Sequence, residues 1–135
     1  MTIASDIMTA KVVSIRQTAT VREALKLLAE LDVRHLPVVD ERDELVGMLS
    51  ERDLLRLRRS TEVLNRAVSE VMSADVLVVT PTTHVDEIID LMTEHKVGAL
   101  PVVDNDSQLA GIVSYVNVLR AAGRAFAQIE PLLMS

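Results

Sequence analysis

An internal repeat constrains the fold of this chain more than any other feature of its sequence. The segment 34–53 reads RHLPVVDERDELVGMLSERD, and the segment 98–117 reads GALPVVDNDSQLAGIVSYVN. Gly47 of the first segment recurs as Gly111 of the second, 64 positions later. At this offset about 19 of 51 aligned pairs, from Asp6 onward, are identical without a gap. The 135 residues therefore form one compact unit built twice, or two half-units that share a core.

Each copy is predicted to contain a strand, a helix, two strands and a further helix, in that order. Thr20 is typical of a helix N-cap, and Glu23 three residues later completes a capping box. The predicted elements of the first copy, after a short turn or helix at Ile3–Met8, are the strands Val12–Ile15, Leu36–Val39 and Val46–Leu49 and the helices Val21–Leu31 and Glu51–Leu57. Those of the second copy are the strands Val76–Val79, Leu100–Val103 and Ala110–Val113, the helix Val85–Glu94, and a last helix from Tyr115 towards Gln128 that Pro131 should end.

The predicted fold class is α/β in the mixed α+β sense, with two tandem repeats. One repeat has too few residues to bury both faces of its sheet, so we expect the copies to pack sheet to sheet about a pseudo-twofold axis. The expected division is a first repeat at residues 1–60, a connector at 61–69, a second repeat at 70–124 and a C-terminal tail at 125–135. The stretch between the repeats is not rich in glycine or proline, which indicates a partly helical connector.

Composition excludes several classes of function. A net charge of −6 argues against nucleic-acid binding, and with Tyr115 and Phe126 as the only aromatic residues the core must be aliphatic. The chain has no cysteine, and its three histidines are too scattered in the sequence to predict a metal site. No apolar run approaches a membrane span and no signal peptide is visible, so we expect a cytoplasmic protein without membrane association.

The repeated motifs resemble a known family. The order of elements, the LPVVD strand and the G-x-x-S-x-x-[DN] segment are similar to the cystathionine-β-synthase (CBS) domain, and two copies in tandem resemble a Bateman module. The likeness covers about Ile3 to Ala122. It implies a regulatory module, not an enzyme, that binds an adenosine-containing ligand (AMP, ADP, ATP, S-adenosylmethionine or NAD) in a cleft between the repeats. It also implies a flat homodimer joined through helices.

The resemblance gives roles to the segment that runs from Gly47 to Asp53. The Asp53 carboxylate would accept hydrogen bonds from both ribose hydroxyls, because an ionised carboxylate offers paired acceptors, and Ser50 would reach towards ribose or phosphate. Gly47 would let the ligand approach. The alternative needs no ligand, since Ser-x-x-Asp is also a helix capping box.

Basic residues beside the signature suggest a phosphate contact. Arg34 and His35 precede the LPVVD strand, where related modules place basic groups against phosphates, and Arg52 could add charge. The alternative is that Arg34 and Arg52 are surface charges and that His35 bonds to backbone.

The second copy departs from the pattern, which predicts unequal clefts. Asn117 replaces the carboxylate, and Gly98 and Ala99 replace the two basic residues. The stronger cleft is expected to combine Arg34, His35, Ser50, Arg52 and Asp53 with Val76, Leu77, Val97, Gly98 and Ala99. The weaker one is expected to use Val13, Ser114 and Asn117, together with the first copy's Arg34 and His35.

The sequence therefore predicts a stand-alone regulatory module for an adenine nucleotide, AMP, ADP or ATP, with no required cofactor and an unidentified effector protein that acts in trans. Two alternatives stay open: a ligand-free dimerisation scaffold, and a sensor of S-adenosylmethionine or NAD. We expect a homodimer, because the apolar helix faces exceed what two small sheets can cover. The residues behind this expectation are Leu25, Leu28, Ile89, Met92, Leu119, Ala122 and Phe126.

Overall fold

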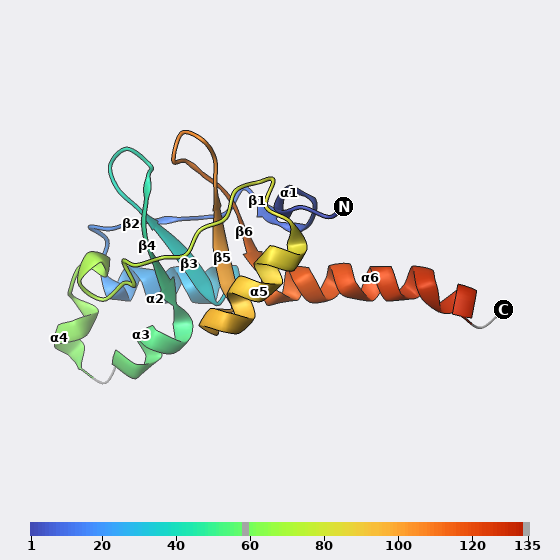
Figure 1. Cartoon of the computed structure of the whole chain (residues 1–135). Helices are drawn as coiled ribbons and strands as arrows, with labels where there is room; N and C mark the ends of the chain where they lie inside the picture. Colours follow the sequence, from blue (N-terminus) through green and yellow to red (C-terminus); the bar gives the residue numbers. More distant parts are fainter. Residues whose placement is uncertain (58–59, 134–135) are drawn as a thin grey trace. The chain divides into compact units, whose positions relative to one another are not determined.

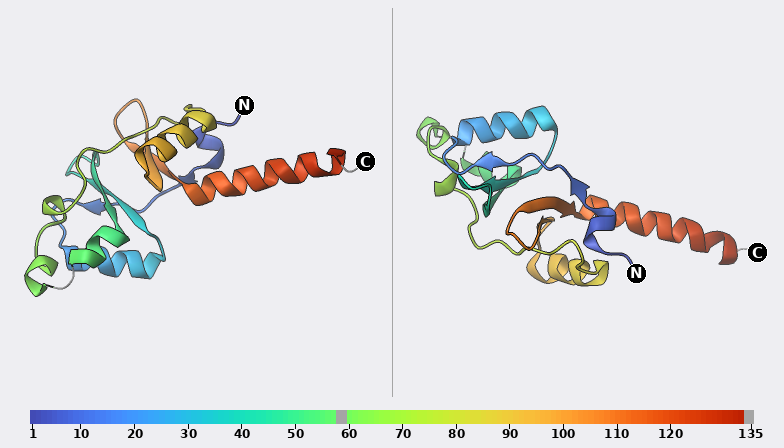
Figure 2. Two further views of the ribbon diagram at one scale, coloured as in Figure 1. Left: turned by 60° about the horizontal axis from the view of Figure 1, so that its bottom comes forward. Right: turned by 90° about the horizontal axis from the view of Figure 1, so that it is seen from above.

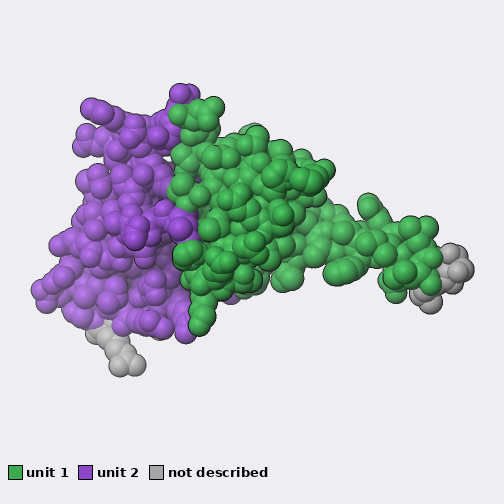
Figure 3. Space-filling model, in the orientation of Figure 1, with its two compact units in different colours: residues 1–12, 78–105, 110–135 green, residues 13–77, 106–109 purple. Residues whose placement is uncertain are grey.

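The computed structural model describes residues 1–57 and 60–133 and shows a mixed α+β fold with two three-stranded sheets (Figure 1). This confirms the predicted fold class. Residues 58–59, at the end of the expected first repeat, and 134–135, in the expected tail, lie outside the described residues. The chain divides into two compact units, coloured in Figure 3: unit 1 is Met1–Val12, Val78–Asn105 and Ala110–Ser135, and unit 2 is Val13–Leu77 and Asp106–Leu109.

Unit 2 contains most of the first repeat. Its elements are β2 (Ile15–Arg16), α2 (Val21–Leu31), β3 (His35–Val39), β4 (Leu45–Ser50), α3 (Glu51–Leu57), α4 (Thr61–Leu64) and the 3-10 turn η1 (Val68–Glu70). In its sheet β3 lies between β2, which runs parallel to it, and β4, which runs antiparallel. The capping box of α2 is confirmed, since Thr20 Oγ1 accepts from Glu23 N at 3.1 Å and Glu23 Oε2 accepts from Thr20 N at 3.3 Å. The helix α4 confirms a partly helical connector.

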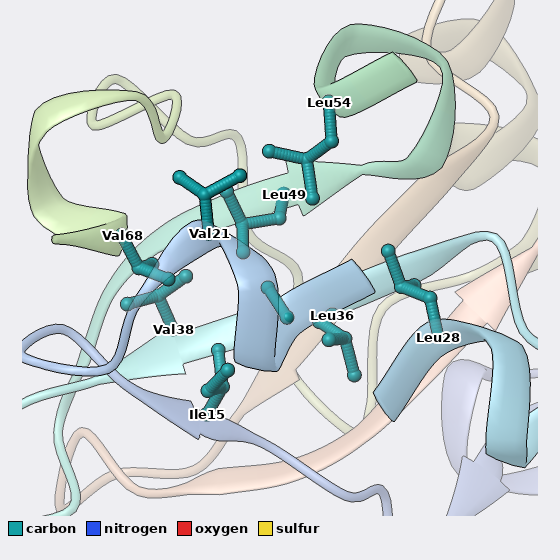
Figure 4. Close-up of a cluster of buried hydrophobic side chains, with 9 residues drawn as sticks. Ile15, Val21, Leu28, Leu36, Val38, Leu49, Leu54 and Val68 are labelled. Carbon is teal, nitrogen blue, oxygen red and sulfur yellow. The ribbon is translucent and has the colours of Figure 1, made fainter. Parts of the chain in front are cut away.

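The core of unit 2 is a single aliphatic cluster between the sheet and its helices (Figure 4). Its members come from every layer of the unit: Ile15, Val21, Ala24, Leu28, Leu36, Val38, Leu49, Leu54 and Val68. No aromatic side chain takes part in the described core, as the composition predicted; Tyr115 and Phe126 are both exposed.

Unit 1 repeats this plan with the second copy. Its elements are α1 (Ala4–Ile7), β1 (Thr9–Ala10), α5 (Val85–His95), β5 (Ala99–Val103), β6 (Leu109–Ser114) and α6 (Tyr115–Leu133). In its sheet β6 lies between β1 and β5. The helix α6 extends well beyond the other elements of unit 1 (Figure 2). None of the described helices is both long and apolar enough to cross a membrane.

Two predicted edge strands are wrong. The strand expected at 12–15 is reduced to β2, and the strand expected at 76–79 is reduced to one parallel bridge between Val79 and Val102. That bridge is the repeat counterpart of the Ile15–Val38 pairing. The apolar residues before it, such as Val78 at 47% exposure, do not pair, because an edge position offers a neighbour on one side only.

The predicted end of the last helix is also wrong. Helix α6 continues through Pro131 to Leu133. Proline removes one amide donor but has a backbone φ that suits a helix, so a single lost hydrogen bond does not terminate α6 before Leu133.

The segment that precedes each repeat pairs with a strand of the other repeat. Residues 1–12 belong to unit 1, and the stretch that contains η1 belongs to unit 2. Met48 and Ser73 exchange two backbone hydrogen bonds, of 2.9 and 3.0 Å, and β1 pairs with β6 in the same way. The approach is close: a Cβ on Gly47 would lie 2.9 Å from the Ser73 carbonyl oxygen, and one on Gly111 would lie 2.7 Å from the Thr9 carbonyl oxygen.

We predict that alanine at either strand glycine destabilises the protein. Gly47→Ala and Gly111→Ala should each lower the free energy of unfolding by about 1–3 kcal/mol, because the new methyl group overlaps backbone. Gly123→Ala in α6 is the control, since nothing lies within 4 Å of its Cβ position, and it should gain about 0.5–1 kcal/mol of helix stability. Urea unfolding measures all three. Equal effects at Gly47 and Gly123 would contradict the close-approach argument.

Candidate functional site

The repeated sequence pattern places its polar residues where a strand ends and a helix begins. In unit 2 this junction is the step from β4 to α3, between Ser50 and Glu51. Ser50 Oγ accepts a hydrogen bond from Asp53 N at 3.1 Å, which confirms that Ser50 caps α3. The carbonyl of Arg34 accepts from Glu51 N at 2.8 Å. Two amides of the helix start are therefore engaged within the protein.

Asp53 itself does not complete a capping box. Its carboxylate is exposed, and it accepts no hydrogen bond from any residue that the structure describes. Both oxygens remain available as paired acceptors next to the Ser50 hydroxyl. This is the arrangement that a vicinal diol would require.

His35 is the first residue of β3 and lies opposite Ser50 in the ladder with β4. It is half-buried, and burial lowers the pKa of its imidazole below the usual 6.5, while the charge of Asp53 partly offsets this by raising the pKa. His35 is therefore mainly neutral at neutral pH. Its electrostatic link to Asp53 connects β3 with α3 at the junction.

Arg34 is already ion-paired. Its Nη1 lies 2.5 Å from Glu51 Oε1, although the Arg34 side chain is 72% exposed and that of Glu51 only 26%. Arg52 is exposed on α3. With His35 neutral, the junction carries two guanidinium groups and two carboxylates, so its charges balance.

At the equivalent junction of unit 1, the polar side chains form hydrogen bonds with one another and with the backbone. Asn117 Oδ1 accepts from Ser114 N at 2.8 Å and from Ser114 Oγ at 3.0 Å, and Ser114 Oγ accepts from Asn117 N at 3.3 Å. The Asn117 amide nitrogen donates to Thr9 Oγ1 at 3.4 Å. In this copy Ser114 and Asn117 therefore cap the start of α6.

The backbone of the two junctions is nonetheless the same. The Gly98 carbonyl accepts from Tyr115 N at 3.0 Å, which is the counterpart of the Arg34–Glu51 bond. The side chains at these two positions differ completely, because neither glycine nor tyrosine carries a charge.

The structure thus brings Arg34, His35, Ser50, Arg52 and Asp53 together at one junction. The other residues singled out in the sequence lie apart from it along the chain. Val76 and Leu77 are half-buried residues near the end of unit 2, and Val13 is 45% exposed at its start. In unit 1, Val97 and Gly98 are half-buried and Ala99 is buried at the start of β5.

Two features of the site were not anticipated. Glu51 was not singled out, because its partner Arg34 is 17 residues away and no sequence spacing signals their contact. The expected role of Gly47 as an opening for a ligand is wrong. Its missing side chain is filled by Met72, whose Sδ would lie 2.5 Å from a Cβ there. Among the described residues, no three His, Cys, Asp or Glu side chains gather as metal ligands.

Comparison with known proteins identifies the family. The CBS domain matches residues 4–60 and again residues 68–124, so the chain belongs to the CBS-domain family and contains two copies of the domain. Both copies include the junction described above.

Three similar proteins illustrate the range of relatives. A crystal structure of CBSX2 from Arabidopsis thaliana in complex with AMP superposes with a TM-score of 0.84 at 34% identity, over 93% of this chain and 98% of that one. A CBS domain pair in complex with 5′-methylthioadenosine and S-adenosyl-L-methionine superposes with a TM-score of 0.85 at 26% identity, over 93% and 98%. Inosine-5′-monophosphate dehydrogenase of Methanocaldococcus jannaschii is 30% identical over 87% of this chain, which spans only 23% of that enzyme.

We predict a measurable link between His35 and Asp53. Asp53→Asn removes the charge that raises the His35 pKa, so this pKa should fall further below its usual 6.5. Because the unfolded histidine binds protons more readily, stability should decline as pH falls through about 6.5 towards the lowered pKa, and more steeply in the variant. Titration of the His35 imidazole signal by NMR and urea unfolding at pH 5 to 8 test this. Glu30→Gln, which removes a carboxylate paired with Lys26, is the control. An unchanged His35 titration in Asp53→Asn would contradict the link.

Proposed function

We propose that this chain is a regulatory module that binds an adenosine-containing ligand, with AMP, ADP or ATP as the favoured class, and signals to an effector protein in trans. The observation that carries the proposal is the unengaged Asp53 carboxylate beside Ser50 in unit 2. The amide oxygen of its counterpart Asn117 accepts two hydrogen bonds from Ser114. A residue needed only as a helix cap would be expected to look like Asn117.

The relatives support an adenosyl ligand and leave its identity open. One similar structure is a complex with AMP, and another is a complex with 5′-methylthioadenosine and S-adenosyl-L-methionine. The second of these structures supports the alternative of an S-adenosylmethionine sensor. Enzymes among the relatives are several times longer than the matched region, which supports a regulatory role over a catalytic one.

Each residue of the unit 2 junction has a proposed role. Asp53 accepts from the two ribose hydroxyls, and Ser50, whose hydroxyl hydrogen is not needed for capping, donates to ribose or phosphate. Arg34 and Arg52 contact phosphate, and the neutral His35 contacts the ligand as a hydrogen-bonding group. Val76, Leu77, Val97, Gly98 and Ala99 remain predicted ligand contacts, and Val13, Ser114 and Asn117 remain predictions for a weaker second site.

The exchange Asp53→Asn separates ligand binding from capping. Affinity for AMP should fall about tenfold or more, since hydrogen bonds to a charged group contribute roughly 1.5–3 kcal/mol. Stability should change little, because the Asp53 carboxylate holds no amide and the cap is supplied by Ser50. Isothermal titration and urea unfolding measure the two quantities.

Asn117→Asp is the matched control for that experiment. It makes the reverse exchange at the equivalent position, where the cap network should be disturbed and AMP affinity at the unit 2 junction preserved. If Asp53→Asn binds AMP as tightly as the parent chain, or if adenosine, AMP and S-adenosylmethionine all fail to bind the parent, the proposed function is wrong and the ligand-free scaffold is favoured.

The homodimer is proposed on the exposed face of α6. No described residue of this helix is buried, and its apolar residues recur alternately at three and four positions, the spacing of a coiled-coil seam. The seam consists of Tyr115, Leu119, Ala122, Phe126, Ile129 and Leu133. Two residues expected in the interface are excluded from it: Leu28 and Met92 are buried in the cores of their own units.

Charges placed on the seam should separate the protomers. Phe126→Glu, at a side chain that is 69% exposed, should convert a dimeric mass to a monomeric one without loss of folding, because the site is apolar in the pair and solvated in the monomer. Gln128→Glu, off the seam, carries the same added charge and should leave the mass unchanged. Light scattering at tens of micromolar protein, with circular dichroism as the check on folding, measures this. A monomeric mass for the parent chain would contradict the proposed homodimer.

A further inference from the structure

Arg34 and Glu51 are joined twice at the junction that holds Ser50 and Asp53. Their side chains form an ion pair with 2.5 Å between Nη1 and Oε1, and the Arg34 carbonyl accepts from Glu51 N at 2.8 Å. The backbone bond alone is kept in unit 1, between Gly98 and Tyr115. The ion pair is therefore an addition specific to unit 2 and is not required by the fold of the junction.

A ligand phosphate and the Glu51 carboxylate compete for the same donors. Glu51 engages Nη1 of Arg34, so a phosphate cannot bind both Nη groups of the guanidinium in the bidentate way while this ion pair lasts. Arg34 is 72% exposed, so its pair with Glu51 is hydrated and readily exchanged. A phosphate that binds both Nη groups of Arg34 must displace Glu51, and the net gain of that exchange is only the difference between two ion pairs.

Further phosphates would meet an unfavourable charge. Once displaced, Glu51 keeps its negative charge at the first residue of α3, one position from Ser50 and two from Asp53 along the chain. With His35 mainly neutral, the charge that opposes these carboxylates comes from Arg34 and Arg52. Once the first phosphate has taken Arg34, a second or third phosphate meets the repulsion of Glu51 and Asp53, which Arg52 alone among these residues can offset.

We propose that Glu51 is a specificity-determining residue of the adenosyl site, which by holding Arg34 restricts the site to adenosyl ligands with at most one phosphate. This inference rests on the proposed function, because it concerns the ligand that the same junction would select. It assigns Glu51 a role in discrimination and none in holding the adenosine part.

Isothermal titration of adenosine, AMP and ATP into four proteins tests the inference. The proteins are the parent chain, Glu51→Gln, Arg34→Ala and the double variant. In the parent, AMP should bind at most about fivefold more tightly than adenosine, and ATP more weakly than AMP, because an exposed ion pair contributes no more than this. Glu51→Gln should tighten AMP by about fivefold and ATP by more, and leave adenosine unchanged.

The double variant shows whether Glu51 acts through Arg34. With Arg34→Ala already present, Glu51→Gln should no longer improve AMP binding. Glu62→Gln is the control for the change in net charge, since Glu62 also pairs with an arginine, Arg66, in α4. It should leave the ratio of AMP to adenosine affinity as in the parent chain.

The outcomes that overturn the inference are distinct from failure of the proposed function. If adenosine and AMP bind in an Asp53-dependent way but Glu51→Gln leaves their affinity ratio and the rank of ATP unchanged, the selectivity role is wrong and the proposed function stands. If Glu51→Gln improves AMP binding equally with and without Arg34, Glu51 acts as a general charge and the inference is also wrong. Absence of binding by all three ligands overturns both proposals.

Discussion

The rest of the structure depends on a backbone contact that β4 and β6 each make with the segment that precedes the other repeat. Met48 of β4 exchanges two hydrogen bonds with Ser73, and β6 pairs likewise with Thr9 and Ala10. The contact is possible only because Gly47 and Gly111 have no side chain. It holds the strand whose last residue is the capping serine, so the position of the junction follows from it. It also means that β4 and β6 each pair with a segment from outside their own repeat.

The duplicated backbone explains how one copy can acquire a site that the other lacks. Both junctions keep the bond from the first helical amide to the carbonyl before the LPVV strand, and both keep a serine cap on the third amide. These bonds satisfy the backbone without the help of charged groups. The side chains at Arg34 and Glu51, and at Gly98 and Tyr115, are therefore free to diverge. At these matched positions unit 2 has two charged side chains, Arg34 and Glu51. Unit 1 has none there, since its one ionisable group is the Tyr115 phenol.

Features set by local pattern could be predicted from the sequence, and features set by pairing across the fold could not. The capping box at Thr20 and the central strands of both copies are signalled by residues a few positions apart. The edge strand expected at 76–79 failed because its residues are strand-like but have no partner to pair with along most of their length. The same limit applies to the site. The repeat singled out Ser50 and Asp53, whereas the contact of Arg34 with Glu51 and the packing of Met72 against Gly47 become visible only once distant segments are brought together.

The charge balance at the junction bears on how such a site would recognise a ligand. The net charge of the chain is −6, and two arginines offset two carboxylates at the junction while His35 is mainly neutral. Attraction of a phosphate by net local charge is therefore weak, and exposed pairs are further screened by salt over about 8–10 Å. Directional hydrogen bonds are less weakened by a balanced local charge and by salt, because they depend on the placement of donors and acceptors rather than on net charge. Selectivity at this junction would then come mainly from the paired acceptors of Asp53, with Arg34 adding to it only as far as Glu51 releases the guanidinium group.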